Sequence, residues 1–146
     1  MMGDARDVPL RYMAAWNRLD ADACAECFAE DGVREGRIMA QATSPGTRFP
    51  RFEGRAAIRE RIAGFMAAVP DLAVEVTRIG EGPEGTVWLE WRLTGTHTGD
   101  WGGWRARGER IDVPAVSIYR VVEGRIAEET EYIDPAVLMS PPPEGG

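Results

Sequence analysis

The chain has 146 residues, 44% of them hydrophobic and 28% charged, which is typical of a single globular domain over residues 1–146. Its net charge is −7 and all 17 basic residues are arginine, so the composition argues against nucleic-acid binding and excludes a lysine Schiff base. No apolar run approaches the roughly 18 to 20 residues of a membrane span. Because the N-terminus is acidic and does not resemble a signal peptide, we expect a cytoplasmic protein.

Two helices are expected near the N-terminus. Asp7 and Pro9 are typical of a helix start, with Asp7 as the N-cap and the proline in the first turn, and apolar residues then recur at helical spacing as far as Arg18. Asp20 would cap a second helix over residues 21–28. That helix holds both cysteines. Since the chain has one histidine and no second cysteine pair, buried thiols are a better interpretation than a zinc site.

The next segment combines a short strand, a long loop and a third helix. The strand is expected over residues 33–39, and the loop over residues 40–53, which hold two prolines and a glycine. Loops of this length tend to be functional or disordered, so their side chains are candidates for a lid or a pocket rim. These candidates are Arg48, Phe49, Arg51 and Phe52. An apolar stripe at helical spacing then predicts a core-facing helix over residues 55–68.

The chain after Pro70 has the pattern of successive strands. We expect strands over residues 72–79, from Thr86 onward, over 111–122 and over 125–134, with glycine-containing turns between them. The tail, residues 135–146, is rich in proline and glycine and is expected to be flexible. Helices followed by antiparallel strands predict an α+β fold, with three N-terminal helices packed on a curved, mainly antiparallel β-sheet.

The strand that begins at Thr86 is the centre of the predicted sheet. Val87, Leu89, Trp91 and Leu93 alternate with polar residues and so share the core face. The same alternation places His97, the only histidine, on the core side. Two tryptophans, Trp101 and Trp104, follow it in a glycine-containing turn. This arrangement fits the rim of a small-molecule pocket, but it also fits a core strand with a loop that covers an edge of the sheet.

The last strand carries several acidic residues on both faces. Ala127, Glu129, Glu131 and Ile133 share one face, and Ile126, Glu128, Thr130, Tyr132 and Asp134 share the other. If the first face points inward, Glu129 and Glu131 enter the interior roughly 6 to 7 Å apart. Burial and mutual repulsion would then raise the pKa of at least one carboxyl, which would make it a usable general base. The alternative is an exposed acidic face that limits edge pairing.

Four segments together resemble one protein family. They are RYMAAWN, FEGRAAIRERI, GTHTGDWGG and VSIYRVVEGRIAEETEYID, and they are similar, in the same order, to segments of the SnoaL-like polyketide cyclases. This family is a branch of the nuclear-transport-factor-2-like superfamily and shares a cone-shaped α+β fold with ketosteroid isomerase. The resemblance spans nearly the whole chain. It implies a pocket between the three helices and the concave face of the sheet, and often dimerisation through the sheet.

The resemblance also implies a chemistry. Characterised cyclases of this family use no cofactor and close a ring by an intramolecular aldol reaction, in which an acidic residue on the last strand is helped by a histidine and by a tyrosine on the first helix. Glu131 matches the acid, which is an aspartate in the family, and Tyr12 matches the tyrosine. Ser117 stands at the position of the family's histidine. After the GTHTG motif, Trp104-Arg105-Ala106-Arg107 replaces the usual apolar stretch with proline.

We therefore predict a cofactor-independent acid/base enzyme that acts on a small apolar carbonyl compound by cyclisation, isomerisation or dehydration. Glu131 would be the base, with His97 and Tyr12 as donors, and no metal is expected. The residues predicted to bind substrate are Trp16, Phe52, Trp91, Trp101, Trp104, Ser117, Tyr119 and Glu129. Arg51 and Arg105 are candidates for pairing with a substrate carboxylate, although both also fit as surface arginines.

Two other functions fit the same sequence. One is a small-molecule-binding protein without catalytic activity, because a fold does not determine function. The other is an epoxide or ester hydrolase, in which a carboxylate activates water beside an arginine.

We also expect a homodimer through the outer face of the sheet. This face would carry Trp88, Val116 and Ile118 among the charged residues Glu90, Arg92 and Arg120. An interface between two copies would cover this apolar surface.

Overall fold

The computed structural model describes residues 4–38, 50–101 and 105–133. The elements are α1 (Asp7–Asn17), α2 (Ala21–Glu26), β1 (Phe28–Ile38), β2 (Arg51–Glu53), α3 (Arg55–Ala68), β3 (Ala73–Glu81), β4 (Thr86–His97), β5 (Glu109–Val122) and β6 (Arg125–Ile133). None of these helices is long and apolar enough to cross a membrane. Trp104, Arg48, Phe49 and the tail from residue 134 lie outside the described residues.

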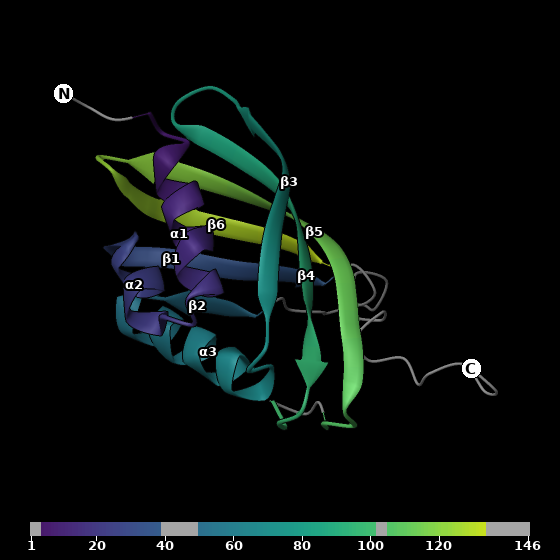
Figure 1. Cartoon of the computed structure of the whole chain (residues 1–146). Coiled ribbons are helices and arrows are strands. Elements are labelled where there is room, and N and C mark those ends of the chain that lie inside the picture. The colour runs from purple at the N-terminus through teal and green to yellow at the C-terminus, as the bar shows by residue number, and fades with distance from the viewer. Residues whose placement is uncertain (1–3, 39–49, 102–104, 134–146) are drawn as a thin grey trace, which may run out of the picture.

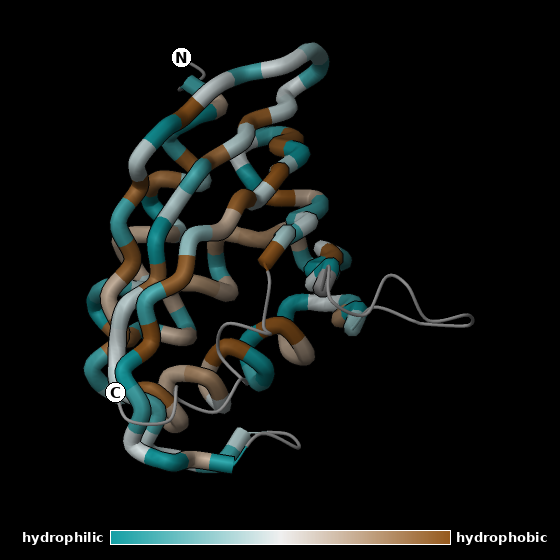
Figure 2. Tube along the Cα trace, turned by 90° about the vertical axis from the view of Figure 1, so that its right-hand side faces the viewer, coloured by the Kyte–Doolittle hydropathy of each residue, from teal (hydrophilic) through white to brown (hydrophobic). Residues whose placement is uncertain are grey.

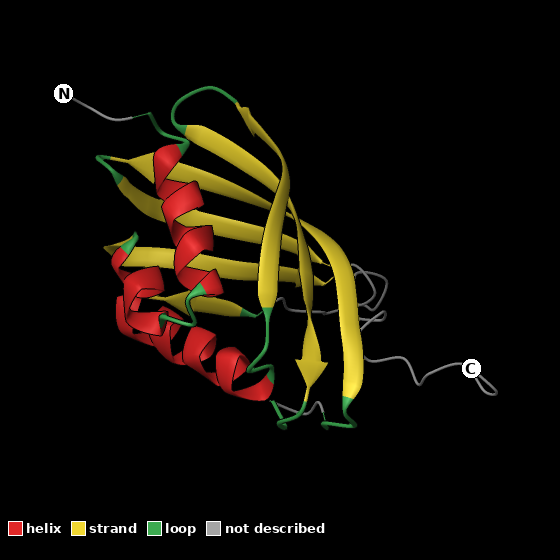
Figure 3. Ribbon diagram, in the orientation of Figure 1, coloured by secondary structure: helices red, strands yellow, loops and turns green. Residues whose placement is uncertain are grey.

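The described strands form one sheet in the order β2-β1-β6-β5-β4-β3, in which β1 and β6 are parallel and all other neighbours are antiparallel. The three helices lie against the same face of this curved sheet (Figures 1 and 3). This confirms the α+β fold with three helices on a mainly antiparallel sheet. The helices are not consecutive, however, because β1 and β2 separate α2 from α3.

The helix starts agree with the sequence in two cases and differ in one. Asp20 caps α2 as predicted, since its Oδ1 accepts a hydrogen bond from the Ala23 N–H at 3.0 Å, and α3 covers the predicted residues. Asp7 is not the N-cap of α1 but its first helical residue. It is Asp4, further upstream, whose carboxylate accepts the Arg6 N–H. In the first turn, Asp7 still interacts favourably with the helix dipole.

Two strands differ from the prediction. β1 begins at Phe28 rather than near residue 33, because the fully buried Phe28 pairs with Ile126 of β6. β2 occupies part of the segment expected to be a loop, and it pairs with β1 through Phe52 and Arg34. Short-range sequence patterns do not reveal either pairing.

The core lies between the helices and the inner face of the sheet. Along β4, Val87, Leu89, Trp91, Leu93 and His97 are buried, as the alternation predicted. Figure 2 shows the same alternation of apolar and polar residues along the strands. Both cysteines, at the α2 end of the core, are free and buried, as expected.

The alternation on β6 is interrupted by a β-bulge at Ala127. Arg120 of β5 pairs with Glu128, but the next residue, Val121, pairs with Ile126, so Ala127 has no partner on β5. The extra residue places Ile126 and Glu129 in the interior together, where both are about 99% buried or more. The prediction that these two residues lie on opposite faces was therefore wrong, because a bulge changes the direction of the side chains that follow it.

Candidate active site

A cavity of about 120 Å³ lies between the helices and the inner face of the sheet, which is several times the space that one buried water needs. Its wall is largely apolar and aromatic. Its lining residues are Tyr12, Met13, Trp16, Arg34, Gly36, Pro50, Phe52, Arg61, Ile62, Phe65, Val74, Trp91, Leu93, Trp101, Glu129, Glu131 and Ile133. Four of the lining residues are arginine or glutamate, and we describe them as two groups. They are Arg34, Glu129 and Glu131 in the first group and Arg61 in the second.

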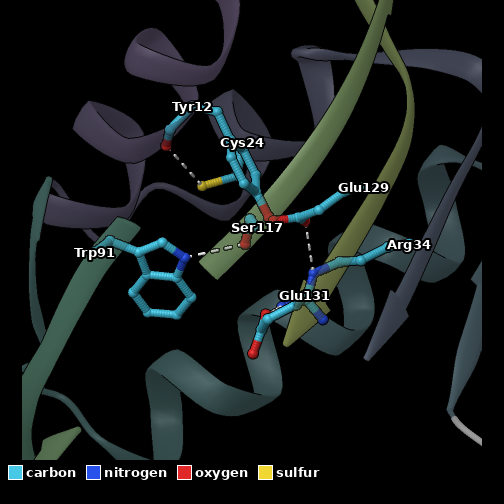
Figure 4. A network of polar contacts seen from close by, with 7 residues as sticks. All are labelled: Tyr12, Cys24, Arg34, Trp91, Ser117, Glu129 and Glu131. Atoms are coloured by element: carbon cyan, nitrogen blue, oxygen red, sulfur yellow. Dashed lines mark hydrogen bonds and ion pairs between the residues drawn. The ribbon is translucent and has the colours of Figure 1, made fainter. Parts of the chain in front are cut away.

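The first group, here called the acid end, consists of Glu129, Arg34 and Glu131. Arg34 donates from Nε to Glu129 Oε1 at 3.0 Å and from Nη2 to Glu131 Oε2 at 2.6 Å. Tyr12 donates its hydroxyl to the same Oε1 of Glu129 at 2.9 Å. In Figure 4 the arginine lies between the two carboxylates. All the charged groups of the acid end are therefore paired.

The strand pairing explains how these residues meet. β1 runs parallel to β6, with Arg34 opposite Glu129 and Gly36 opposite Glu131. Because Gly36 has no side chain, Glu131 is not covered on that side and borders the cavity. The two glutamates lie two residues apart on β6 and so point to the same face. The sequence did not determine whether Glu129 and Glu131 point inward or outward. In the structure both side chains lie on the inner face of the sheet and line the cavity.

Burial controls the protonation of these groups. It raises the pKa of Glu131 above its ordinary value of 4.5, a rise that the Glu129 charge increases and the Arg34 charge opposes. Burial would by itself lower the pKa of Arg34, but Glu131 and Glu129 hold it well above its ordinary value. Burial and the Glu129 charge raise the pKa of the Tyr12 hydroxyl well above 10. Glu131 is thus a carboxyl with a raised pKa beside a fixed cation.

A second layer of polar groups lies beneath the acid end. Ser117 Oγ accepts a hydrogen bond from Trp91 Nε1 at 3.0 Å. Tyr119 is fully buried, stands opposite Glu129 in the β5–β6 register, and packs edge-to-face on Tyr12 with ring centroids 6.0 Å apart. Burial, with the nearby Glu129 charge, raises the pKa of Tyr119 well above 10. Ser117 and Tyr119 thus support the wall of the site but are not among the residues that line the cavity, whereas Trp91 does line it.

The second charged group, here called the aromatic end, consists of Arg61, Phe52 and Trp101. The guanidinium carbon of Arg61 lies 3.6 Å from the ring centroid of Trp101 and 5.0 Å from that of Phe52. Phe65 packs edge-to-face on Trp101 with centroids 5.1 Å apart. Burial and the charge of Arg34 lower the pKa of Arg61 to about 10. Arg61 is thus surrounded by aromatic rings, whereas Arg34 is surrounded by carboxylates.

The structure brings most of the predicted site residues together. The cavity wall includes Tyr12, Trp16, Phe52, Trp91, Trp101, Glu129 and Glu131. His97 is buried at the end of β4, opposite Glu109, and is not one of the described lining residues. The two arginines proposed for a substrate carboxylate, Arg51 and Arg105, are exposed, and Arg51 pairs with Glu53.

Two charged lining residues, Arg34 and Arg61, were not predicted as site residues. Arg61 had a signal in the sequence, because it lies three residues after Ile58 and four before Phe65, and so falls on the apolar stripe of α3. Arg34 had no comparable signal. Its partner Glu129 is 95 residues away in the sequence, and only the parallel pairing of β1 with β6 brings them together.

The described residues include no group of three or more His, Cys, Asp or Glu side chains placed to hold a metal ion. What the acid end provides is a pair of carboxylates around a guanidinium, in contact with an apolar cavity. Such an arrangement can accept a proton from a bound molecule and stabilise a negative charge that develops on it.

Comparison with known proteins places the chain in a family. The SnoaL-like polyketide cyclase family matches residues 6–140, whereas no curated protein matches. A solved structure of a candidate SnoaL-like polyketide cyclase from Jannaschia sp. CCS1 is 19% identical, with a TM-score of 0.76 over 94% of this chain and 93% of that one. AclR, a candidate hydroxylase from Streptomyces galilaeus, is 25% identical, with a TM-score of 0.73 over 94% of each chain.

A third structure is SalBIII, an epoxide hydrolase/cyclase-like enzyme in pyran ring formation in the polyether salinomycin. It is 23% identical, with a TM-score of 0.68 over 88% of this chain and 89% of that one. All three structures therefore share the fold over most of their length. Because the family match also spans nearly the whole sequence, the chain belongs to the SnoaL-like polyketide cyclase family.

Proposed function

We propose that the protein is an acid/base enzyme that needs no cofactor and acts on a small apolar carbonyl compound, by cyclisation or by a related isomerisation or dehydration. The observation that carries this proposal is the position of Glu131. It is a carboxyl with a pKa raised by burial, held at 2.6 Å by an arginine, at the wall of an apolar cavity. A raised pKa, a charged partner and a cavity together are typical of a catalytic base.

In the proposed reaction, the Glu131 carboxylate takes the proton from the carbon next to the substrate carbonyl. The electrons of the broken C–H bond form the C=C bond of an enolate, and the carbonyl oxygen gains the negative charge. The enolate carbon then attacks a second carbonyl of the same molecule and forms a C–C bond, or it is protonated at another carbon. In both cases Glu131 returns the proton that it took, so the enzyme ends unchanged.

Arg34 is the donor that we assign to the enolate oxygen. An arginine has five N–H groups, and two of them bond the glutamates, so others remain for the substrate. A fixed guanidinium at the wall of a largely apolar cavity stabilises a developing anion strongly. Tyr12, which donates its hydroxyl to Glu129, acts as a positioning residue, because it fixes the carboxylate that in turn holds Arg34.

One observation also favours a second candidate, hydrolysis or ring opening of an epoxide. Two carboxylates around one arginine can serve as base and acid on the two sides of such a ring. The base takes a proton from water or a hydroxyl group, and the acid gives one to the oxygen that leaves the carbon. SalBIII, which shares the fold, is described as epoxide hydrolase/cyclase-like. A diol product that carries one labelled oxygen from water would identify epoxide hydrolysis, and a cyclic ether product without label would identify ring opening by the substrate's own hydroxyl group. Carbonyl chemistry would give neither product.

The test of the main proposal is exchange of deuterium from solvent into a panel of apolar cyclic ketones, followed by mass spectrometry. We expect Glu131→Gln to reduce the exchange rate by about 100-fold or more, which is typical of the loss of a general base. Glu128→Gln is the matched control, because Glu128 is on the same strand but its side chain is 44% exposed and lies near Arg120. No exchange by the wild-type protein, or equal exchange by Glu131→Gln, would contradict the proposal. A ketone that binds without exchange would indicate a binding protein.

A further inference from the structure

Arg61 is a charged lining residue for whose Nε the described part of the chain offers no hydrogen-bond acceptor. Its Nε is buried and has no hydrogen-bond partner, and no ion pair within 4.0 Å joins it to a described acidic residue. Since the pKa of Arg61 is about 10, the side chain is charged near neutral pH. The side chain as a whole is only partly buried, but an N–H group that is buried without an acceptor is costly and is therefore uncommon in proteins.

The aromatic rings around Arg61 do not satisfy its N–H groups. A guanidinium stacked on a ring interacts through its flat face, whereas its five N–H bonds lie in its plane and point away from the ring. With its carbon 3.6 Å from the Trp101 centroid and 5.0 Å from that of Phe52, Arg61 is held in place by these rings. Its donors remain available to a molecule in the cavity.

The acid end does not neutralise Arg61 directly. Glu131 is close enough to raise the pKa of Arg61 slightly, but its carboxylate accepts a hydrogen bond from Arg34. Glu129 also bonds Arg34 and, in addition, Tyr12. The cavity wall therefore holds a set of paired charges, Arg34 with Glu129 and Glu131, and one cation, Arg61, that has no ion-pair partner among the described residues.

We propose that Arg61 binds a carboxylate of the substrate, so that the substrate class is a flat, apolar carboxylic acid. This inference rests on the proposed function and deepens it, because it orients the molecule with its anionic group at the aromatic end and its reacting carbon at the acid end. A carboxylate fits better than a phosphate. It is planar and matches the fork of an arginine with two parallel hydrogen bonds, and its single charge matches a single unpaired cation.

The test compares two probes of similar shape, 2-naphthoate and 2-naphthylmethanol, by titration calorimetry. We expect the wild-type protein to bind the carboxylate about tenfold more tightly than the alcohol. This is the gain in affinity expected from one hydrogen bond to a charged group. Arg61→Gln should remove this preference while it changes the affinity for the alcohol by less than about twofold. Arg61→Lys keeps the charge but not the fork, and it should retain part of the preference.

The matched control is Arg59→Gln, on the same helix, because Arg59 is exposed and pairs with Asp22. It should bind both probes as the wild-type protein does. Equal affinity of the wild-type protein for the two probes, no measurable binding of 2-naphthoate, or an unchanged preference in Arg61→Gln would overturn the proposal. Glu131→Gln separates this result from the proposed function, since that variant should lose ketone exchange and still prefer the carboxylate.

Discussion

The two arginines of the cavity, Arg34 and Arg61, differ in what surrounds them. Arg34 lies between two carboxylates, which hold its pKa well above the ordinary value. Arg61 lies against two aromatic rings, and burial lowers its pKa to about 10. The same side chain thus occurs in two different environments in one cavity. We propose that Arg34, whose charge is paired, organises the reacting groups, and that Arg61, which has no ion-pair partner among the described residues, receives the ligand.

The largest difference between the two ends should appear in stability. Arg34→Met leaves Glu129 and Glu131 buried without their cation, and we expect the free energy of unfolding to fall by about 3–5 kcal/mol. Arg61→Met should change it by less than about 1 kcal/mol, because the lost stacking, about 0.5–2 kcal/mol, is offset by removal of a poorly solvated charge. Urea denaturation of the two variants near neutral pH measures both values.

An exposed ion pair provides the control for this comparison. Arg92 pairs with Asp112 on the outer face, where the two side chains are 55% and 46% exposed. Arg92→Met should therefore cost no more than about 1 kcal/mol. The loss in Arg34→Met should also become smaller in acid, because burial raises the pKa of Glu131 and its protonation removes an unpaired charge. A loss in Arg34→Met no larger than that in Arg92→Met would show that the acid end does not stabilise the fold.

The elements of the fold were largely predictable because they depend on neighbouring residues. The apolar stripe of α3 predicted its limits, and Asp20 predicted the start of α2. The alternation along β4 predicted its buried face. Each of these signals comes from periodicity or capping within one element. The family resemblance then identified the fold as a whole, and it is confirmed by the match over residues 6–140.

The acid end was predictable only in part. The spacing of Glu129 and Glu131 predicted that they share one face of the strand, but it did not predict whether that face points inward. The bulge at Ala127 has no clear signal in the sequence. Arg34 reaches them through strand pairing between distant segments. Such contacts depend on the register of the sheet, and single-sequence patterns do not determine it. Arg61, in contrast, could have been found as a charge on an apolar stripe.

A second prediction concerns the pH dependence that Glu131 gives to stability. Because burial raises its pKa in the folded protein above 4.5, the folded state keeps a proton that the unfolded chain has already lost. The resulting stabilisation is complete below the unfolded pKa and disappears as the pH rises through the folded pKa. Glu131→Gln removes this contribution. Its stability relative to the wild-type protein should therefore increase from acid to neutral pH.

Urea denaturation across this pH range measures the effect, with Glu128→Gln as the control. Glu128 is partly exposed and lies outside the acid end, so the corresponding difference should be smaller. A difference for Glu131→Gln that decreases from acid to neutral pH would mean that the pKa of Glu131 is lowered in the folded protein. Arg34 would then dominate over burial, and Glu131 would be a weaker base than we propose.

The smallest expected effect on stability concerns the outer face of the sheet, which we propose as a homodimer interface. Trp88 and Ile118 stand opposite each other on β4 and β5 and are 38% and 40% exposed, unlike the buried residues that alternate with them. Ile118→Glu should change the free energy of unfolding of the monomer by less than about 0.5 kcal/mol, because the side chain is on the surface. It should nevertheless prevent association, since it places a charge within an apolar contact.

Light scattering tests this prediction, with Leu10→Glu as the matched control. Leu10 is 39% exposed but belongs to α1, on the other side of the molecule. We expect the wild-type protein and Leu10→Glu to have twice the 16.1 kDa mass of one chain, and Ile118→Glu to have the mass of a monomer. A monomeric wild-type protein would refute the interface. Dissociation caused by Leu10→Glu alone would instead place the contact on the helices, close to the cavity, where a second copy could restrict access to the acid end.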